Sequence, residues 1–243
     1  MARSEAFRVM SGYRAFPDNI ALAEHAAQQW LQRLAARDDS KSFTVALSGG
    51  RIPRLLYKAV ATQAMEGSFN NVHFFWGDER VVPPTDEDSN FKLAAVPLLL
   101  ALKIPDAQVH RILTERGEAI AVQQAEAEIC RIASLNNRGQ PILDLVLLGM
   151  GEDGHVASLF PGDAEALESK AVYRAVTSPK PPPRRITLGF PALAAAREVW
   201  VLVSGQGKVE AMRASLLEAG TTPLAKVLQS RTHTEIFTDF DLA

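Results

Sequence analysis

The sequence predicts a three-layer α/β fold, a Rossmann-like and mostly parallel sheet with helices on both faces. Short apolar segments typical of buried strands alternate along the chain with longer segments whose apolar residues recur at helical spacing. The 243 residues, 47% of them apolar, can bury a sizeable core. Turn residues follow several of the strands, as expected where a ligand site lies at the carboxyl edge of a sheet. We therefore expect one domain over residues 1–243.

The N-terminal part of the chain predicts a helix and then two strands joined by a second helix. Residues 18–37 have apolar residues at helical spacing, and Asp18 is a suitable N-cap. Phe43–Leu47 is predicted to be a buried strand, followed by a helix with Pro53 in its first turn. Val72–Trp76 is predicted to be the second strand. These segments begin the alternation of strands and helices.

The rest of the chain continues the alternation after a polar, proline-containing loop at 77–90. A rigid surface loop is expected at Pro179–Pro183, where prolines restrict the backbone. The final strand should lie near an edge of the sheet. The remaining predicted elements are helices at 89–100, 118–135 and 208–217, and strands at 143–148, 199–203 and 235–238.

Composition excludes several classes of function. The 26 basic and 28 acidic residues give a formal charge of -2, without the basic excess that nucleic-acid binding requires. The single cysteine, Cys130, can form neither an intramolecular disulfide nor a thiolate metal cage, which suits a reducing cytoplasm. Met1–Phe16 lacks the apolar core of a secretory signal, and no apolar run approaches the roughly 20 residues that span a bilayer. We expect a soluble, cytoplasmic protein.

Candidate anion-binding groups lie in two turns, each of which follows a predicted strand. The first comprises Ser48, Gly49, Gly50 and Arg51, whose backbone donors open a helix, but it lacks the lysine and hydroxyl of a P-loop. A tight packing turn is the alternative there. The second turn spans residues 77–83, where the Arg80 guanidinium can bind phosphate oxygens. Neighbouring acids such as Asp78 either orient Arg80 or are simply solvated.

A third loop, from Gly149 to His155, resembles a dinucleotide fingerprint but is better explained as a catalytic loop. Glu152 and Asp153 would repel a diphosphate, and Pro161 limits the predicted helix after His155 to about one and a half turns. Histidine titrates near neutrality, so His155 can take a proton from water while Asp153 holds its ring. The alternative is a histidine that only hydrogen-bonds its own loop.

Other polar residues have weaker signals. Asn90 either caps a helix with Ser89 or contacts a ligand. Arg185 follows the proline run, and Lys208 follows a glycine-containing turn, so each is a candidate anion-binding cation or a solvated side chain. The remaining histidines are expected to have structural or surface roles, and no histidine spacing indicates a metal site. Cys130 is expected to be a packed thiol.

Together these segments resemble the 6-phosphogluconolactonase family, which shares its fold with glucosamine-6-phosphate deaminases and ribose-5-phosphate isomerases. The resemblance spans nearly the whole chain and is carried by five segments in a fixed order. They are Leu47 to Pro53, Trp76 to Pro83 with Ser89 and Asn90, Leu148 to Pro161, Arg185 to Leu188, and Val203 to Lys208.

The resemblance implies hydrolysis of 6-phosphoglucono-1,5-lactone, a step of the oxidative pentose phosphate pathway, with no cofactor or metal. By motif position His155 is the implied general base and Asp153 its support. Arg80 and the Gly49–Gly50 turn are the implied phosphate-binding elements, with further contacts from Ser48, Arg51, Asp78, Asn90, Arg185 and Lys208. The chain departs from the family at Arg51 and Ile52, where the family has hydroxyl residues, so those side-chain contacts to phosphate are lost.

Two other functions are possible on the same fold. A glucosamine-6-phosphate deaminase has a similar Asp-Gly-His loop but continues with a glutamate-containing segment, whereas here Ala157 to Pro161 contains no acid. A non-catalytic sugar-phosphate-binding protein would need a DNA-binding or partner module, for which the sequence offers no segment. The partner expected is a small sugar-phosphate lactone, bound by a monomer or small homo-oligomer with no nucleic acid or membrane.

Overall fold

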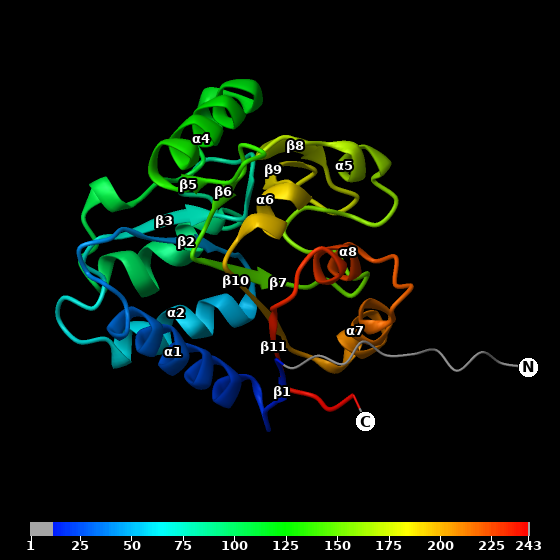
Figure 1. The fold of residues 1–243 in the computed structure, drawn as a ribbon, viewed down its shortest axis with the longest axis horizontal. Coiled ribbons are helices and arrows are strands. Elements are labelled where there is room, and N and C mark those ends of the chain that lie inside the picture. Colours follow the sequence, from blue (N-terminus) through cyan, green and yellow to red (C-terminus); the bar gives the residue numbers. More distant parts are fainter. Residues whose placement is uncertain (1–11, 243) are drawn as a thin grey trace, which may run out of the picture.

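A computed structural model of the chain describes residues 12–242. Its largest feature is a six-stranded sheet in which every neighbouring pair is parallel, in the order β1-β11-β10-β7-β2-β3 (Figure 1). The predicted α/β fold is confirmed, and the last strand lies one place from an edge. The six strands are β1 (Tyr13–Ala15), β2 (Phe43–Leu47), β3 (Val72–Trp76), β7 (Leu145–Gly149), β10 (Glu198–Val203) and β11 (Glu235–Thr238).

Helices cover both faces of this sheet (Figure 1). On one face α1 packs against α2, and the Asp18 side chain caps α1 as predicted by accepting from the Ile20 and Ala21 N–H groups. On the other face lie α4, α6, α7 and α8. The helices are α1 (Asn19–Ala35), α2 (Arg51–Gln63), α3 (Asn90–Ala94), α4 (Glu118–Ile132), α5 (Ala164–Glu168), α6 (Phe190–Ala195), α7 (Val209–Leu216) and α8 (Pro223–Gln229), with a π-helical turn at Ala95–Leu100 and 3-10 turns at Asp106–Gln108, Thr114–Arg116 and Gln206–Lys208.

The order of the strands opens a crevice at the carboxyl edge of the sheet. The chain crosses the sheet in one direction from β1 through β2 to β3, and then returns through β7 and β10 to β11. Because crossovers between parallel strands are right-handed, this reversal moves the connecting segments to the opposite face. The loops after β2 and β7, which are neighbours in the sheet, therefore diverge, and ligands bind in such a gap.

A second, antiparallel sheet of three strands packs beside the first, and local sequence did not predict it. Its order is β4-β9-β8, comprising β4 (Asp78–Arg80), β9 (Arg184–Leu188) and β8 (Tyr173–Thr177). The expected polar loop over 77–90 is wrong at its start, where Asp78–Arg80 forms a strand, and burial of Asp78 and Glu79 excludes the alternative that they are simply solvated. Their strand forms by pairing with β9, about 100 residues away in the sequence. A two-stranded hairpin is formed by β5 (Ser134–Leu135) and β6 (Pro141–Ile142).

The short helix expected between His155 and Pro161 is absent from the structure. Val156 instead forms isolated bridges with Met150 and Leu159. Ala157 has a φ of 50°, in the left-handed region, which cannot continue a right-handed helix. The segment is a compact turn. The predicted helix over 118–135 also ends earlier, at Ile132, because the next residues pair in β5.

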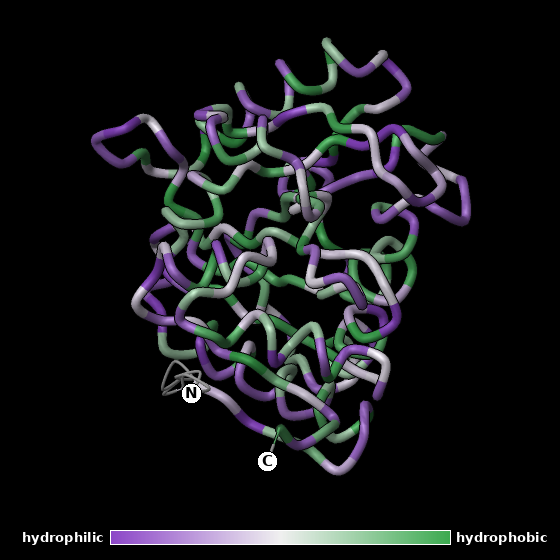
Figure 2. Tube along the Cα trace, turned by 90° about the vertical axis from the view of Figure 1, so that its right-hand side faces the viewer, coloured by the Kyte–Doolittle hydropathy of each residue, from purple (hydrophilic) through white to green (hydrophobic). Residues whose placement is uncertain are grey.

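The core lies between the sheet and its helical layers. Trp30, Trp76 and Trp200 are fully buried in it. Hydrophobic stretches run through the interior of the chain trace, and hydrophilic ones gather in the outer loops (Figure 2). Among residues 12–242, none of the helices combines the length and apolarity needed to span a bilayer.

Glu79 joins β4 to the start of α3 through four hydrogen bonds. Its Oε1 accepts from the backbone N–H of Arg80 at 2.8 Å and of Asn90 at 2.7 Å. Its Oε2 accepts from the Phe91 N–H at 2.7 Å and the Ser89 hydroxyl at 3.2 Å. Burial raises the pKa of Glu79 to about 7, although the backbone donors oppose the rise. The carboxyl group therefore organises the strand and helix that carry Arg80 and Asn90.

We expect Glu79→Ala to lower the free energy of unfolding by about 2–4 kcal/mol, because several buried donors lose their acceptor. Urea denaturation of both proteins at the same pH measures the change. The control is Glu66→Ala at an exposed carboxylate, expected to change stability by less than about 0.5 kcal/mol. Equal stabilities of the two variants would contradict this role for Glu79.

Candidate functional site

A cavity of about 460 Å³ lies in the crevice between the ends of β2 and β7. The loops after β2, β7 and β10 contribute to its walls, together with residues of β4, α3 and β9. Ten of the eleven predicted site residues line it, and the eleventh, Asp153, contacts one of those ten. The ten are Ser48, Gly49, Gly50, Arg51, Asp78, Arg80, Asn90, His155, Arg185 and Lys208.

The turn after β2 is fixed by a buried tyrosine. The Tyr57 hydroxyl donates to the Ser48 carbonyl at 2.7 Å and accepts from the Ser48 N–H at 3.0 Å. Gly50 has a φ of 106° and precedes the first residue of α2, a conformation that favours glycine. The Gly149 N–H donates to the Ser48 Oγ at 3.3 Å, so the β2 and β7 loops contact each other at the cavity. These contacts hold the start of α2 against the cavity wall.

Arg51 crosses the cavity to the loop after β10. Its Nη2 donates to the Ser204 hydroxyl at 3.0 Å, and that hydroxyl donates to the Asp239 carboxylate at 2.5 Å. Lys208 lies in the same part of the wall, where burial and the nearby Arg51 charge lower the pKa of its ammonium. Two cations therefore face one end of the cavity beside the N-terminus of α2, a favourable place for an anion.

The wall formed by β4 and α3 presents two buried polar atoms without partners among the described residues. Asn90 donates through Nδ2 to the Asp78 carbonyl at 2.8 Å, which leaves its Oδ1 unpaired. Arg80 donates through Nη1 to the Asp88 carbonyl at 2.7 Å, while its Nε is unpaired. Buried polar atoms of folded proteins are normally hydrogen-bonded. Both residues line the cavity, so their side chains are candidates for contact with a ligand.

His155 is paired with Asp153 at the cavity, a contact that the sequence left open. The Asp153 Oδ1 contacts the His155 Nδ1 and also accepts from the His155 N–H at 3.3 Å. Burial lowers the pKa of His155, although the Asp153 carboxylate opposes this. Partial burial would raise the pKa of Asp153, but its bonds to His155 lower it to about 2. At neutral pH the pair is thus an ionised carboxylate and a neutral imidazole.

Gly151 makes room for the His155 side chain. A Cβ added at Gly151 would lie 2.1 Å from the His155 Nδ1 and Cε1 atoms. The Gly151 N–H also donates to the His155 carbonyl at 2.9 Å. Any larger residue at 151 would displace the imidazole, since real Cβ atoms do not approach that closely. The position of the His155 ring therefore requires glycine at residue 151.

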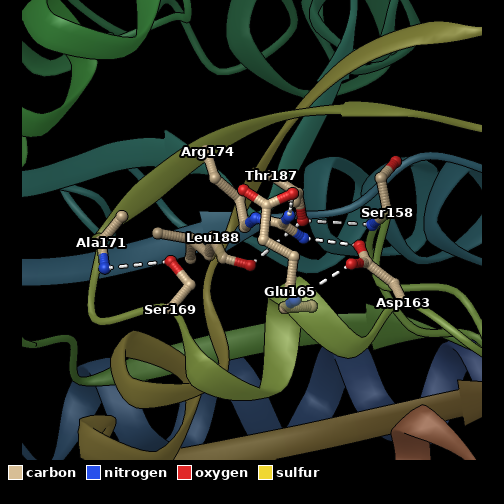
Figure 3. Close-up of polar contacts among 9 residues, drawn as sticks. Ser158, Asp163, Glu165, Ser169, Ala171, Arg174, Thr187 and Leu188 are labelled. Carbon is tan, nitrogen blue, oxygen red and sulfur yellow. Dashed lines mark hydrogen bonds and ion pairs between the residues drawn. The ribbon is translucent and has the colours of Figure 1, made fainter.

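The segment after His155 is attached to the antiparallel sheet. Figure 3 shows the Ser158 N–H donating to the Thr187 hydroxyl on β9, at 3.1 Å. Farther along, Asp163 accepts from Arg174 of β8 at 2.6 Å (Figure 3). It also accepts from the Ala166 N–H in α5. The Ser158 hydroxyl donates in addition to the Asp78 Oδ2 at 2.7 Å. The catalytic-loop candidate is thereby connected to the same sheet that carries Arg80 and Arg185.

Sequence reasoning missed several residues of the site. Glu152 and Ser204 line the cavity, and Tyr57 fixes its floor. Lys180, in the expected proline loop, lies 3.2 Å from the Asp153 Oδ2. Ser204 follows an apolar strand and precedes glycines, so the strand-end rule applied to Ser48 would have found it. No local signal identifies Lys180, because its contact with Asp153 joins distant loops. Tyr57 lies only nine residues after Ser48, but its place on the predicted helix does not reveal the contact.

The described residues contain no group of three or more His, Cys, Asp and Glu side chains suited to a metal ion. Cys130 is a half-buried free thiol packed against the core. His73 and His110 contact each other away from the cavity, with 2.9 Å between Nδ1 and Nε2. The cavity itself brings together the His155–Asp153 pair, the carboxylates of Asp78 and Glu152, and several cations.

Comparison with known proteins gives a consistent family. Residues 17–237 match the family model described as glucosamine-6-phosphate isomerases/6-phosphogluconolactonase. The 6-phosphogluconolactonase of Mycobacterium tuberculosis is 37% identical over 221 residues, which cover 88% of this chain and 89% of that protein. The chloroplastic 6-phosphogluconolactonase 3 of Arabidopsis thaliana is 40% identical over 192 residues, 76% of this chain and 59% of that one.

Solved structures show the same fold. The crystal structure of 6-phosphogluconolactonase from Leishmania guyanensis superposes with a TM-score of 0.83 at 28% sequence identity. The match covers 93% of this chain and 95% of that chain. The fold similarity therefore spans nearly the whole of both chains.

The cavity geometry predicts that two neighbouring glycines respond differently to substitution. A Cβ at Gly49 would lie 1.9 Å from the Asn90 Oδ1, whereas at Gly149 the nearest atoms are 3.8 Å away. We expect Gly49→Ala to lower the free energy of unfolding by about 1–3 kcal/mol through overpacking, and Gly149→Ala by less than about 1 kcal/mol. Urea denaturation of both variants measures this. A Gly49→Ala protein as stable as the Gly149→Ala protein would refute the tight contact.

Proposed function

The chain belongs to the family of glucosamine-6-phosphate isomerases and 6-phosphogluconolactonases, and we propose that it hydrolyses 6-phospho-D-glucono-1,5-lactone to 6-phospho-D-gluconate. The observation that carries the proposal is the pairing of His155 with Asp153 at a cavity whose other walls present cations. A base and an anion-binding region in one cavity are what a phosphorylated ester substrate requires. The reaction belongs to the oxidative pentose phosphate pathway.

In the proposed mechanism His155 acts as the general base. Its Nδ1 is held by Asp153, which leaves Nε2 as the nitrogen that takes a proton. As Nε2 takes that proton, the oxygen of a water molecule attacks C1 of the lactone. The C1–O5 bond then breaks, and the imidazolium returns the proton to O5, which becomes the 5-hydroxyl. The product carboxylic acid finally ionises and releases a proton to solvent.

The pair also suits this role electrostatically. The imidazolium that forms during attack lies against an ionised carboxylate, which stabilises its charge. Before attack the imidazole is neutral, since burial lowers the pKa of His155. A neutral base with a nearby carboxylate needs no metal to activate water.

Phosphate recognition is assigned to the cationic part of the cavity. The turn at Gly49–Arg51 offers backbone donors at the start of α2, and Arg51 takes the place of the family's hydroxyl residue there. Arg80 and Lys208 line the same cavity, and the Arg80 guanidinium is the proposed donor to a phosphate oxygen. Asp78 and Arg185 support these walls through their contacts with Asn90 and the proline loop.

The residues after His155 favour a lactonase over a deaminase. Ala157 to Pro161 includes no acid, and the Ser158 hydroxyl is bound to Asp78. The direct test is hydrolysis of freshly generated lactone by the purified protein, corrected for spontaneous hydrolysis. Acceleration supports the proposal. Ammonium release from glucosamine 6-phosphate without lactone hydrolysis would instead establish a deaminase.

His155→Ala is expected to lower kcat by about 10² to 10⁴-fold, the usual effect of removing a general base. His233→Ala, at an exposed histidine, is the matched control and should retain full activity. Steady-state kinetics and thermal unfolding of both variants separate a catalytic loss from a folding defect. A folded His155→Ala enzyme with near-normal turnover would refute the assignment of the base.

Arg80→Ala is expected to raise KM by about 10-fold or more, because a charge-assisted hydrogen bond to the substrate is lost. Arg54→Ala provides the control, since Arg54 is an exposed arginine in the first turn of α2. Initial rates over a range of lactone concentrations give both constants. Unchanged KM and kcat in the Arg80 variant would exclude a substrate contact.

A further inference from the structure

Lys180 contacts the His155–Asp153 pair from the loop between β8 and β9. Its Nζ lies 3.2 Å from the Asp153 Oδ2, while the Oδ1 of the same carboxylate contacts the His155 Nδ1. The two carboxylate oxygens are therefore divided between a lysine and a histidine. A cation on one oxygen limits rotation of the carboxylate and keeps the other directed at the imidazole.

The loop that carries Lys180 is held in place by internal hydrogen bonds and by Arg185. The Ser178 N–H donates to the Pro183 carbonyl at 2.6 Å, and the Lys180 N–H to the Ser178 hydroxyl at 3.0 Å. The buried Arg185 donates to three carbonyls of the loop, those of Lys180, Pro181 and Pro182, at 3.0–3.3 Å. Lys180 thus extends toward Asp153 from a backbone fixed on both sides.

Arg185 connects this loop to the histidine by a second route. Its guanidinium lies 5.7 Å from the centre of the Phe160 ring, which is itself 4.8 Å from the His155 ring. The charged groups that act on His155 come from three segments: Asp153 from its own loop, Lys180 from the proline loop and Asp78 from β4. Of these only Lys180 is a cation.

We propose that Lys180 is a positioning residue, whose ammonium holds Asp153 Oδ1 on His155 and offsets the carboxylate charge so that the imidazole remains unprotonated at neutral pH. The proposal rests on the proposed role of His155 as the base. Without Lys180 the imidazole faces an unscreened carboxylate and gains a proton at higher pH. The Lys180 side chain is 50% exposed, so solvent screens its charge and the effect is modest.

The test uses Lys180→Met, with Lys180→Gln as a second neutral variant and Lys180→Arg to restore the charge. The acid limb of the kcat/KM profile reports protonation of the free enzyme's base. We expect both neutral variants to move that limb upward by about 0.3–1 pH unit, and Lys180→Arg to return it toward the wild-type position. Lys170→Met, at an exposed lysine outside the cavity, should leave the profile unchanged.

An NMR titration of the His155 ring, assigned by comparison with His155→Ala, measures the same protonation without any substrate. We expect the His155 pKa to rise in both neutral variants. An unchanged His155 pKa in folded neutral variants would overturn the proposal, even if KM increases through a direct lysine–substrate contact. If the wild-type protein hydrolyses no lactone, the proposed function fails, while the titration still decides whether Lys180 controls His155.

Discussion

The site depends on the reversal of chain direction between neighbouring strands β2 and β7. Because crossovers are right-handed, the loops after these strands leave toward opposite faces, and a cavity opens between them. One loop begins α2 and contributes backbone donors and Arg51. The other presents His155 against Asp153. The topology therefore separates anion-binding groups from the base by the width of one crevice.

The antiparallel sheet makes this arrangement rigid. Asp78 and Glu79 are buried at one strand and bind the residues that begin α3, including Asn90. The neighbouring strand carries Arg185, which holds the loop of Lys180. Burying these charged groups is costly unless their hydrogen bonds are made, and here each carboxylate has several donors. Two polar atoms, Arg80 Nε and Asn90 Oδ1, stay buried without a partner among the described residues, and both belong to residues that line the cavity.

Much of the main sheet and most site residues were predictable from sequence because their signals are local. The bounds of Phe43–Leu47 and Val72–Trp76 agree with β2 and β3, since buried parallel strands are continuous apolar runs. Turns after such strands identified the loops of Gly49 and His155. The strand at Asp78 was missed because pairing with β9, not apolar alternation, creates it. The helix after His155 was wrongly expected because spacing cannot reveal the left-handed Ala157. Lys180 was missed because its contact with Asp153 joins distant loops.

A crystal structure with bound 6-phosphogluconate tests the central claim most directly, since the product carries both the phosphate and the reacted carbon. The claim predicts the C1 carboxylate within about 3.2 Å of the His155 Nε2. The claim also predicts that the phosphate, at the other end of the bound product, contacts the Gly49–Arg51 turn and the cations of the cavity. A product bound with its phosphate on His155, or outside the crevice between β2 and β7, would contradict it.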